Sequence, residues 1–248
     1  MTASGGRGGS EAEGRLPIEI QTRYERFPVS IKGAFVMRGA DGNPHAVRIE
    51  SARVARIPNG PGKPFAVETR IVDVAPGRDL FMPFEAPVSE IEPGWYVIES
   101  EARVDAGQVF VFASRPFSVP WPRNDVRRGA IAVEKTVRAG KERIRIDRVE
   151  MGGDAAAVVW WPEAGSGAPA ATRVSDAETP ALEAILVADG RQLDVLPPMT
   201  GRSGRSDLRS RGEYRTISYP VPRETKSLAI GVNLASGARS ELIELSFH

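Results

Sequence analysis

The sequence contains no cysteine, and this absence removes several classes of protein at once. Disulfide frameworks, thiolate metal sites and cysteine nucleophiles are all excluded. Histidine is almost as scarce, since His45 and His248 are the two histidines in 248 residues. A zinc site built from histidine and cysteine is therefore excluded as well, and a serine–histidine–aspartate triad would have to use one of these two residues. We predict no cofactor, no metal and no catalytic residue.

His45 closes the run Asp41-Gly42-Asn43-Pro44, which consists of turn-forming residues. Turns of this kind lie at the surface, so we interpret His45 as a solvated turn residue rather than a catalytic base. Asp41 and Asn43 carry oxygen atoms of the kind that calcium prefers, but the further acidic residues of a calcium loop are missing. The run is therefore predicted to be a turn and nothing more.

Long apolar runs are also missing. No stretch of about 18 apolar residues occurs, so we expect no transmembrane helix. The first 15 residues are small and polar, which predicts a flexible tail. They also lack the apolar segment that a signal peptide needs. Unless the chain is trimmed, these features indicate a cytoplasmic protein.

Apolar residues almost never recur at helical spacing over three turns. Short alternating or all-apolar runs, each closed by Gly, Pro, Asn or Asp, predict an all-β protein instead. The segment Pro120-Trp121-Pro122 cannot continue a strand and is taken as a domain boundary. We therefore predict two tandem immunoglobulin-like β-sandwich domains, over residues 16–122 and 123–248, with long polar loops at 165–180 and 200–213 in the second.

The pattern places seven strand candidates in the first domain and eight in the second. The segment 80–91 contains Pro83 and Pro87, so it is predicted as an edge strand or an ordered loop. Short turns are expected at Ala106-Gly107 and at Asp189-Gly190, because glycine readily adopts positive φ. The strand candidates cover residues 16–22, 30–37, 46–57, 65–74, 80–91, 94–105, 108–119, 129–137, 142–151, 155–161, 181–188, 192–196, 214–219, 227–232 and 241–247.

Charge gives little guidance to a partner. The formal net charge of +1 provides no general attraction to nucleic acid, and a nucleic-acid partner is not expected. An arginine-rich segment nevertheless stands out, with arginines separated mainly by glycine and serine. It fits a mobile loop between strands, and the alternative is a flexible segment that binds a polyanion. Its arginines are Arg202, Arg205, Arg209, Arg211 and Arg215.

Tryptophans are the other candidate contact residues. Trp160 and Trp161 are adjacent on a predicted strand, so one must face the core and the other must face outward or lie in an interface. Trp95 has the parity of an outward position on its strand. Outward tryptophans anchor protein partners or stack on sugars. We therefore take Trp95, Trp160 and Trp161 as candidate partner-binding residues.

The segment Glu92-Pro93-Gly94-Trp95-Tyr96-Val97-Ile98, followed by Arg115-Pro116-Phe117-Ser118-Val119, resembles the closing strands of bacterial immunoglobulin-like and fibronectin-like domains. The second half, with Ile144–Val149 and Ala188-Asp189-Gly190, is similar to immunoglobulin-like domains of bacterial envelope and regulatory proteins. The resemblance implies the fold family and no activity, since such sandwiches mostly bind or space other molecules. The cysteine pair and core tryptophan of antibody domains are absent as a set.

These observations favour a non-enzymatic protein-interaction or structural module. Its partner would be a protein, or a second copy of the chain, that contacts the outward aromatic residues and the arginine-rich segment. The alternatives are a carbohydrate-binding module, which would need a flat platform of Trp and Tyr on one sheet face, and a polyanion binder that uses residues 202–215.

Overall fold

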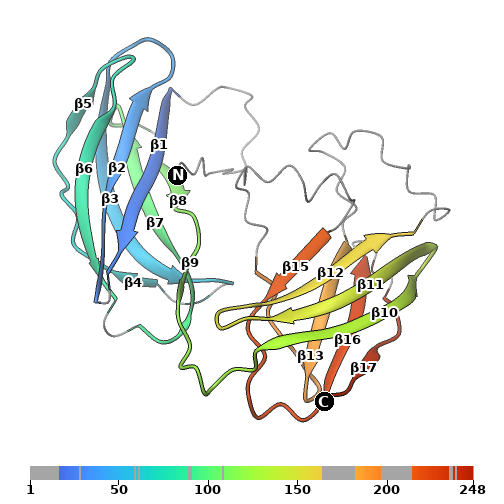
Figure 1. Cartoon of the computed structure of the whole chain (residues 1–248). Helices are drawn as coiled ribbons and strands as arrows, with labels where there is room; N and C mark the ends of the chain where they lie inside the picture. Colours follow the sequence, from blue (N-terminus) through green and yellow to red (C-terminus); the bar gives the residue numbers. More distant parts are fainter. Residues whose placement is uncertain are drawn as a thin grey trace. The chain divides into compact units, whose positions relative to one another are not determined.

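The computed structural model describes residues 17–27, 29–58, 60, 62–88, 91–107, 109–163, 182–196, 214–234, 237 and 239–247. The predicted tail, the loops at 165–180 and 200–213, and Arg202, Arg205, Arg209 and Arg211 lie outside these residues. The chain divides into two compact units, residues 1–119 and 120–248. Every regular element in the described part of the chain is a β-strand, so the all-β prediction is confirmed (Figure 1). No helix among these residues is long and apolar enough to cross a membrane.

The first unit contains two antiparallel sheets (Figure 1). One has the strand order β1-β2-β6, and the other has the order β4-β3-β7-β8, with β5 paired to β3 and β9 paired to β7. The strands are β1 (Ile18–Arg26), β2 (Ser30–Gly39), β3 (His45–Arg56), β4 (Gly62–Pro64), β5 (Val72–Val74), β6 (Leu80–Pro87), β7 (Gly94–Val104), β8 (Val109–Ala113) and β9 (Phe117–Val119).

Alternating side chains of both sheets form the core of the first unit. Phe35 of β2 stacks on Phe84 of β6, with ring centroids 4.7 Å apart, and meets the edge of Phe112 from β8 at 5.8 Å. Phe35 therefore joins the two sheets. Burial of this kind contributes about 25 cal/mol for each Å² of apolar surface and is the main force that holds the layers together.

The second unit also contains two antiparallel sheets, with the orders β10-β11-β12-β15 and β14-β13-β16-β17. One core lies between them, with Ile146, Trp160, Leu186 and Ile230 among its buried residues. The strands are β10 (Gly129–Ala139), β11 (Glu142–Met151), β12 (Ala156–Pro162), β13 (Leu182–Ala188), β14 (Arg191–Gln192), β15 (Tyr214–Ser218), β16 (Leu228–Leu234) and β17 (Ile243–Leu245).

The two units share one connectivity. In the first unit β1 and β2 form a hairpin, β3 and β4 lie in the other sheet, β6 returns beside β2, and β7 and β8 complete the second sheet. The second unit follows the same path. Strands β11 and β12 form a hairpin, β13 and β14 lie in the other sheet, β15 returns beside β12, and β16 and β17 complete the second sheet. Strand β10 is an addition beside β11. The strand order therefore repeats although the sequences of the two units differ.

Turn predictions met different outcomes. Asp189 and Gly190 have φ of 48° and 80°, which confirms the predicted tight turn between β13 and β14. In the β7–β8 turn the positive φ angles belong to Asp105 (50°) and Ala106 (56°), not to Gly107. That turn lies one residue earlier than predicted.

Several predicted strands are shorter than their apolar patterns. In the segment 65–74 only Val72–Val74 forms a strand, although Phe65 still packs on the core. The segment 108–119 is two strands, because the chain leaves the ladder near Pro116, which has no N–H to donate. In the segment 192–196 the ladder ends at Gln192, while Leu196 is buried. Alternation reports burial, and buried or partly buried side chains such as Leu196 and Phe65 can lie beyond the ends of the regular strands.

Candidate protein-interaction surface

The predicted contact residues fall in different places. Trp95 lies on β7 of the first unit, whereas Trp160, Trp161 and Arg215 belong to neighbouring strands β12 and β15 of the second. The structure brings the last three together on one sheet. Alternation along the strands then decides which of them reach the surface.

Trp160 faces the core, with 3% of its surface exposed. Its ring stacks on Tyr214 with a centroid distance of 4.6 Å and an interplanar angle of 14°, and its Nε1–H donates to Thr216 Oγ1 at 3.1 Å. Its role is therefore structural. The prediction that Trp160 contacts a partner is wrong, because the ring is covered on both faces and its N–H is used.

Trp161 points to the opposite face of β12 and is half-buried. The two adjacent tryptophans thus face opposite ways, as predicted. The register places Arg145 of β11 directly opposite Trp161, and Thr136 of β10 opposite Arg145. One row of outward side chains therefore runs across three strands, with the tryptophan at one end of it.

The next row of the same face consists of Arg148, Val159 and Arg215, in that order across β11, β12 and β15. Asp147 is an extra residue in β11, a β-bulge, which shifts the alternation of side chains by one position. Arg148 and Arg145 therefore point to the same, outer face. Cross-strand diagonal neighbours lie about 7–8 Å apart, within reach of long side chains. We call the outward residues Thr136, Arg145, Arg148, Val159, Trp161 and Arg215 the Trp161 face.

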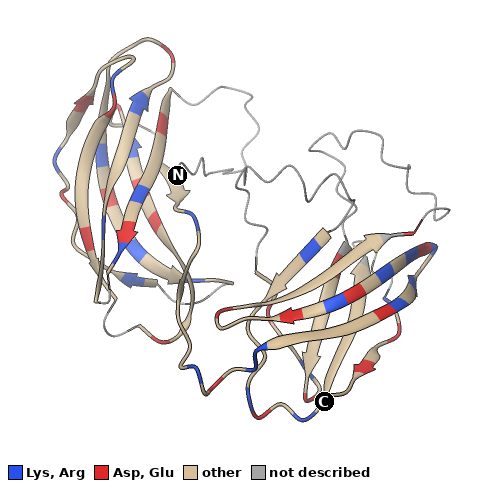
Figure 2. Ribbon diagram, in the orientation of Figure 1, with Lys and Arg blue, Asp and Glu red and all other residues tan. Residues whose placement is uncertain are grey.

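Acidic and basic residues are interspersed along β11 (Figure 2). The arginines of the Trp161 face differ in their partners. Arg148 and Arg215 both bind Glu150, at 2.8 and 2.9 Å, and Arg148 also binds Asp147. These carboxylates, Glu150 first, raise the pKa of Arg148 above its ordinary value. Arg145 has no carboxylate partner among the described residues. A guanidinium that is half-buried, unpaired and opposite a tryptophan is available to an anionic group.

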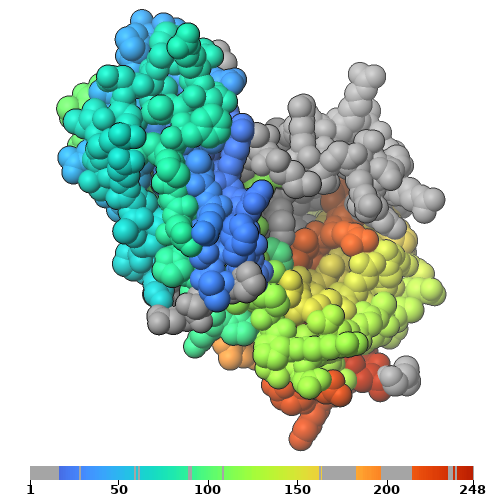
Figure 3. Space-filling model, turned by 60° about the vertical axis from the view of Figure 1, so that its left-hand side comes forward, coloured from blue at the N-terminus to red at the C-terminus, as the bar shows by residue number. Residues whose placement is uncertain are grey.

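Residues of β10 and β11 are seen in yellow-green at the surface of the second unit (Figure 3). Val159 is fully buried although it points to the outer side of the sheet. Its neighbours across the strands are Arg148 and Arg215, whose aliphatic stems are long enough to cover it. The face therefore combines a covered apolar residue, Val159, with the side chain of Trp161 and the guanidinium groups of the arginines.

Trp95 is half-buried beside β9, opposite Ser118. Its carbonyl oxygen accepts a hydrogen bond from Ile57 N–H at 2.9 Å, which ties the ends of β3 and β7 together. Because Trp95 and Trp161 belong to different units, no single sheet presents both. Trp95 is therefore not part of the Trp161 face, and its contact with a partner stays a prediction.

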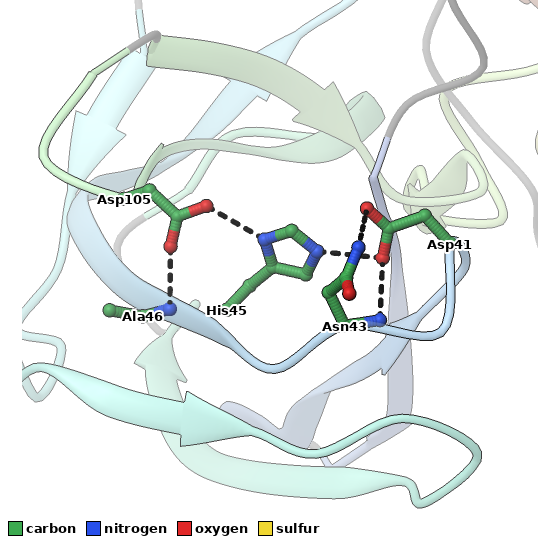
Figure 4. Close-up of polar contacts among 5 residues, drawn as sticks. All are labelled: Asp41, Asn43, His45, Ala46 and Asp105. Carbon is green, nitrogen blue, oxygen red and sulfur yellow. Dashed lines mark hydrogen bonds and ion pairs between the residues drawn. The ribbon is translucent and has the colours of Figure 1, made fainter.

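His45 is not the solvated residue that the sequence predicted, since only 8% of it is exposed. Figure 4 shows its ring between Asp41 and Asp105. Its Nδ1 lies 2.7 Å from Asp105 Oδ2, and its Nε2 lies 2.8 Å from Asp41 Oδ1. Asp41 also accepts the N–H of Asn43, and Asp105 accepts the N–H of Ala46. The turn prediction for residues 41–44 holds, but the imidazole is clamped between two turns.

The clamp is electrostatic. The hydrogen bonds to Asp105 and then Asp41 raise the pKa of His45 above its ordinary value of 6.5. In return, the hydrogen bond to His45 lowers the pKa of Asp105 and brings the pKa of Asp41 down to about 2. The two carboxylates bind opposite ring nitrogens, so they do not converge on one cation. Among the described residues no group of three or more acidic or histidine side chains is placed to hold a metal ion.

A small groove on the outer face of the β1-β2-β6 sheet has a volume of about 170 Å³. Arg38 and Asp79 of its lining bind each other at 2.6 Å, which satisfies both charges. Pockets that enclose small-molecule ligands are typically about 300–1,000 Å³. The groove is thus smaller than a typical ligand site, and two of its charged groups already bind each other.

No protein-family model matches the chain, and a search of curated proteins finds no match to its sequence. The fold, the Trp161 face and the His45 clamp are therefore the observations from which a function is argued.

Proposed function

We propose that this protein is a non-enzymatic interaction module, built from two tandem immunoglobulin-like sandwiches, whose Trp161 face binds an acidic segment of a protein partner. The observation that carries the proposal is the cross-strand pair of Trp161 and Arg145 on the outer face of the β10-β11-β12-β15 sheet. Tryptophan and arginine are the residues most enriched among those that dominate binding energy at protein interfaces.

The strand order supports the immunoglobulin-like part of the proposal. In the letters used for such domains, β1, β2 and β6 take the places of A, B and E, and β3, β7 and β8 take those of C, F and G. Tyr96, near the start of β7, donates its hydroxyl to the carbonyl of Glu92 at 2.8 Å. A tyrosine at the start of strand F that bonds backbone just upstream is a recurrent feature of these sandwiches. The repeated connectivity extends the proposal to the second unit.

The acidic nature of the partner follows from the charges of the face. Arg148 and Arg215 have acidic partners in the chain itself, while Arg145 has none in the described part. An incoming carboxylate would therefore bind Arg145 without breaking an existing ion pair. Planar guanidinium groups bind carboxylates with two parallel hydrogen bonds, which adds geometric selectivity.

A protein segment fits this face better than a sugar does. Sugar-binding platforms use a flat array of aromatic rings, and none of the described outward residues around Trp161 is aromatic; they include Arg145, Val159, Thr136, Arg215 and Glu163. Tyr214, the nearest aromatic residue along β15, stacks on Trp160 at the inner side of the sheet. A single tryptophan bordered by arginines is typical of a protein contact.

The test selects peptides from a random display library on the immobilised full chain and measures their affinity for variants. We expect enrichment of acidic peptides. Trp161→Ala and Arg145→Glu should each weaken binding by about tenfold or more, since residues at the centre of an interface contribute about 2 kcal/mol or more. Arg191→Glu is the matched control, because Arg191 is an exposed arginine of the same unit on the other sheet.

Two results would overturn the proposal. One is a set of selected peptides without acidic bias, and the other is binding that Trp161→Ala and Arg145→Glu leave unchanged. A circular dichroism spectrum of each variant accompanies the affinity measurement, so that loss of fold is distinguished from loss of contact.

A further inference from the structure

Strand β8 is a sheet edge with none of the features that normally prevent edge pairing. Its sequence is Val109-Phe110-Val111-Phe112-Ala113, and within the described residues it pairs with β7 alone. Val111 is 63% exposed and Val109 is 40% exposed. Unpaired backbone groups beside exposed β-branched side chains form a template for another strand.

The other edges of the first unit are each protected. Strand β6 contains Pro83, Pro87 and Glu85. Strands β4 and β5 have three residues each, with Lys63 and a proline in β4 and Asp73 in β5. Strand β1 carries alternating acidic and basic side chains. Strand β9, which continues the β8 side of β7, has three residues, and Arg26 of β1 donates to the carbonyl of Ser118.

The edges of the second unit are protected as well. Strand β10 is interrupted by a bulge next to Glu134, which has a φ of 48°. Strands β14 and β17 contain two and three residues, and β15 carries Arg215. Proline, charge, bulges and short length are the usual means by which proteins block edge-to-edge association. Strand β8 has none of them, which makes it the exception among the described edges.

The hydrogen-bond phase of β8 shows which of its backbone groups are open. Ser114 N–H donates to the carbonyl of Ile98 at 2.8 Å, so residue 114 faces β7. Because bonding direction alternates along an antiparallel strand, Phe112 and Phe110 also bond to β7. The N–H and C=O groups of Val109, Val111 and Ala113 therefore point away from the sheet. The same three residues carry the outward side chains, opposite Arg103, Glu101 and Glu99 of β7.

We propose that the occupant of this edge is β8 of a second copy of the chain, paired antiparallel about a two-fold axis at Val111. In this register Val111 faces Val111, and Val109 faces Ala113 on both sides of the axis. Each of these three pairs exchanges two hydrogen bonds, because all the groups concerned point outward. The strand is self-complementary, since it contains no charge and no like charges meet across the axis.

Pairing of this kind joins two β4-β3-β7-β8 sheets into one continuous sheet. The contact is short, so the dimer is expected to be concentration-dependent rather than permanent. The inference does not rest on the proposed function. The edge belongs to the first unit and the Trp161 face to the second, so either can fail without the other.

Sedimentation velocity of the full chain over a wide range of concentration tests the proposal. We expect a reversible monomer–dimer equilibrium. Val111→Lys should weaken dimerisation by about tenfold or more, because it places two ammonium groups opposite each other at the axis. Ile71→Lys is the matched control, since Ile71 is 67% exposed in the same unit and lies outside β8. Its dimerisation should equal that of the wild type.

A mixed-variant experiment tests the register itself. Val111→Lys and Val111→Glu should each dimerise more weakly than the wild type when alone. A mixture of the two should form a mixed dimer, since opposite charges then meet at the axis. Val111→Pro removes an N–H that faces outward and should abolish pairing without loss of any β7–β8 hydrogen bond. A wild type that is monomeric at every concentration, or a dimer that Val111→Lys and Val111→Pro leave intact, would overturn the proposal.

Discussion

The rings of Trp160 and Tyr214 stack on the inner side of the β12–β15 pair, with centroids 4.6 Å apart. This contact ties the edge strand β15 to the core of the second unit. The next residue of β12, Trp161, points to the outer side of the sheet. Two adjacent tryptophans thus have separate roles, and substitution should separate them.

Trp160→Ala should lower the free energy of unfolding by about 3–5 kcal/mol, the usual cost of deleting a large buried aromatic side chain. Trp161→Ala should cost about 1 kcal/mol or less, as is usual for residues outside the core. Urea denaturation of both variants checks this difference. Equal losses for the two residues would contradict the assignment of one to the core and the other to the surface.

The His45 clamp predicts a pH dependence with two limits. The pKa of His45 is raised on folding, so its stabilising contribution is complete below the ordinary value of 6.5 and is lost as the pH rises through the raised pKa. The pKa of Asp41 is lowered from 3.8 to about 2, so its contribution is present above 3.8 and is lost as the pH falls toward 2. The clamp is therefore most effective between these limits.

Thermal unfolding of the wild type and His45→Gln across this pH range measures the clamp. The difference in melting temperature should be largest between pH 3.8 and 6.5 and should shrink on both sides. His248→Gln is the control, because it removes the other histidine and should keep the wild-type profile. A difference that does not vary with pH would show that His45 acts through packing alone.

A matched pair of serines tests hydrogen bonding in the first core. Ser100 is 1% exposed, and its hydroxyl has no hydrogen-bond partner among the described residues. Ser100→Ala should therefore raise the free energy of unfolding by about 1 kcal/mol. Ser114 accepts the N–H of Ile98 at 2.9 Å through its hydroxyl, and Ser114→Ala should lower that free energy by about 1–3 kcal/mol. Denaturant titration compares the two, and changes of the same sign would contradict the hydrogen-bond assignments.

Gly33 lies between Tyr24 of β1 and Phe84 of β6 in the register of the sheet. A β-carbon at this position would collide with the backbone oxygen of Arg23 and would lie 2.7 Å from the ring of Phe84. Gly33→Ala should therefore lower the free energy of unfolding by about 1–3 kcal/mol through overpacking. Gly33→Ala combined with Phe84→Leu should remain destabilised, because the collision with the backbone oxygen of Arg23 persists, and a neutral single variant would show that the backbone of β1 shifts to accept the β-carbon.

Patterns local in sequence were sufficient for much of the fold. Alternation identified β2, β3, β7 and β11 to within about two residues. The prolines of β6 predicted an edge strand or an ordered loop, and the segment forms an edge strand. The parity of Trp160 and Trp161 follows from chain geometry alone. These features depend on neighbours along the chain, which a single sequence displays.

The pairings that define the candidate sites depend on residues far apart in sequence. Asp41 is four residues from His45 and lies in a visible turn, but Asp105 is 60 residues away, and nothing local indicates that the two turns meet. Arg145 faces Trp161 only because of the β11–β12 register and its bulge at Asp147. The apolar character of β8 is visible in the sequence, whereas its position at an edge requires the topology of the sheet.

The placement of the tryptophans gives each unit its own optical signal. Trp95 is the single tryptophan of residues 1–119, while Trp121, Trp160 and Trp161 all belong to residues 120–248. In a Trp95→Phe variant the indole emission comes from the second unit alone, and its comparison with the wild type isolates the first. The order in which the two sandwiches melt can therefore be followed by intrinsic fluorescence, without labels and without cutting the chain.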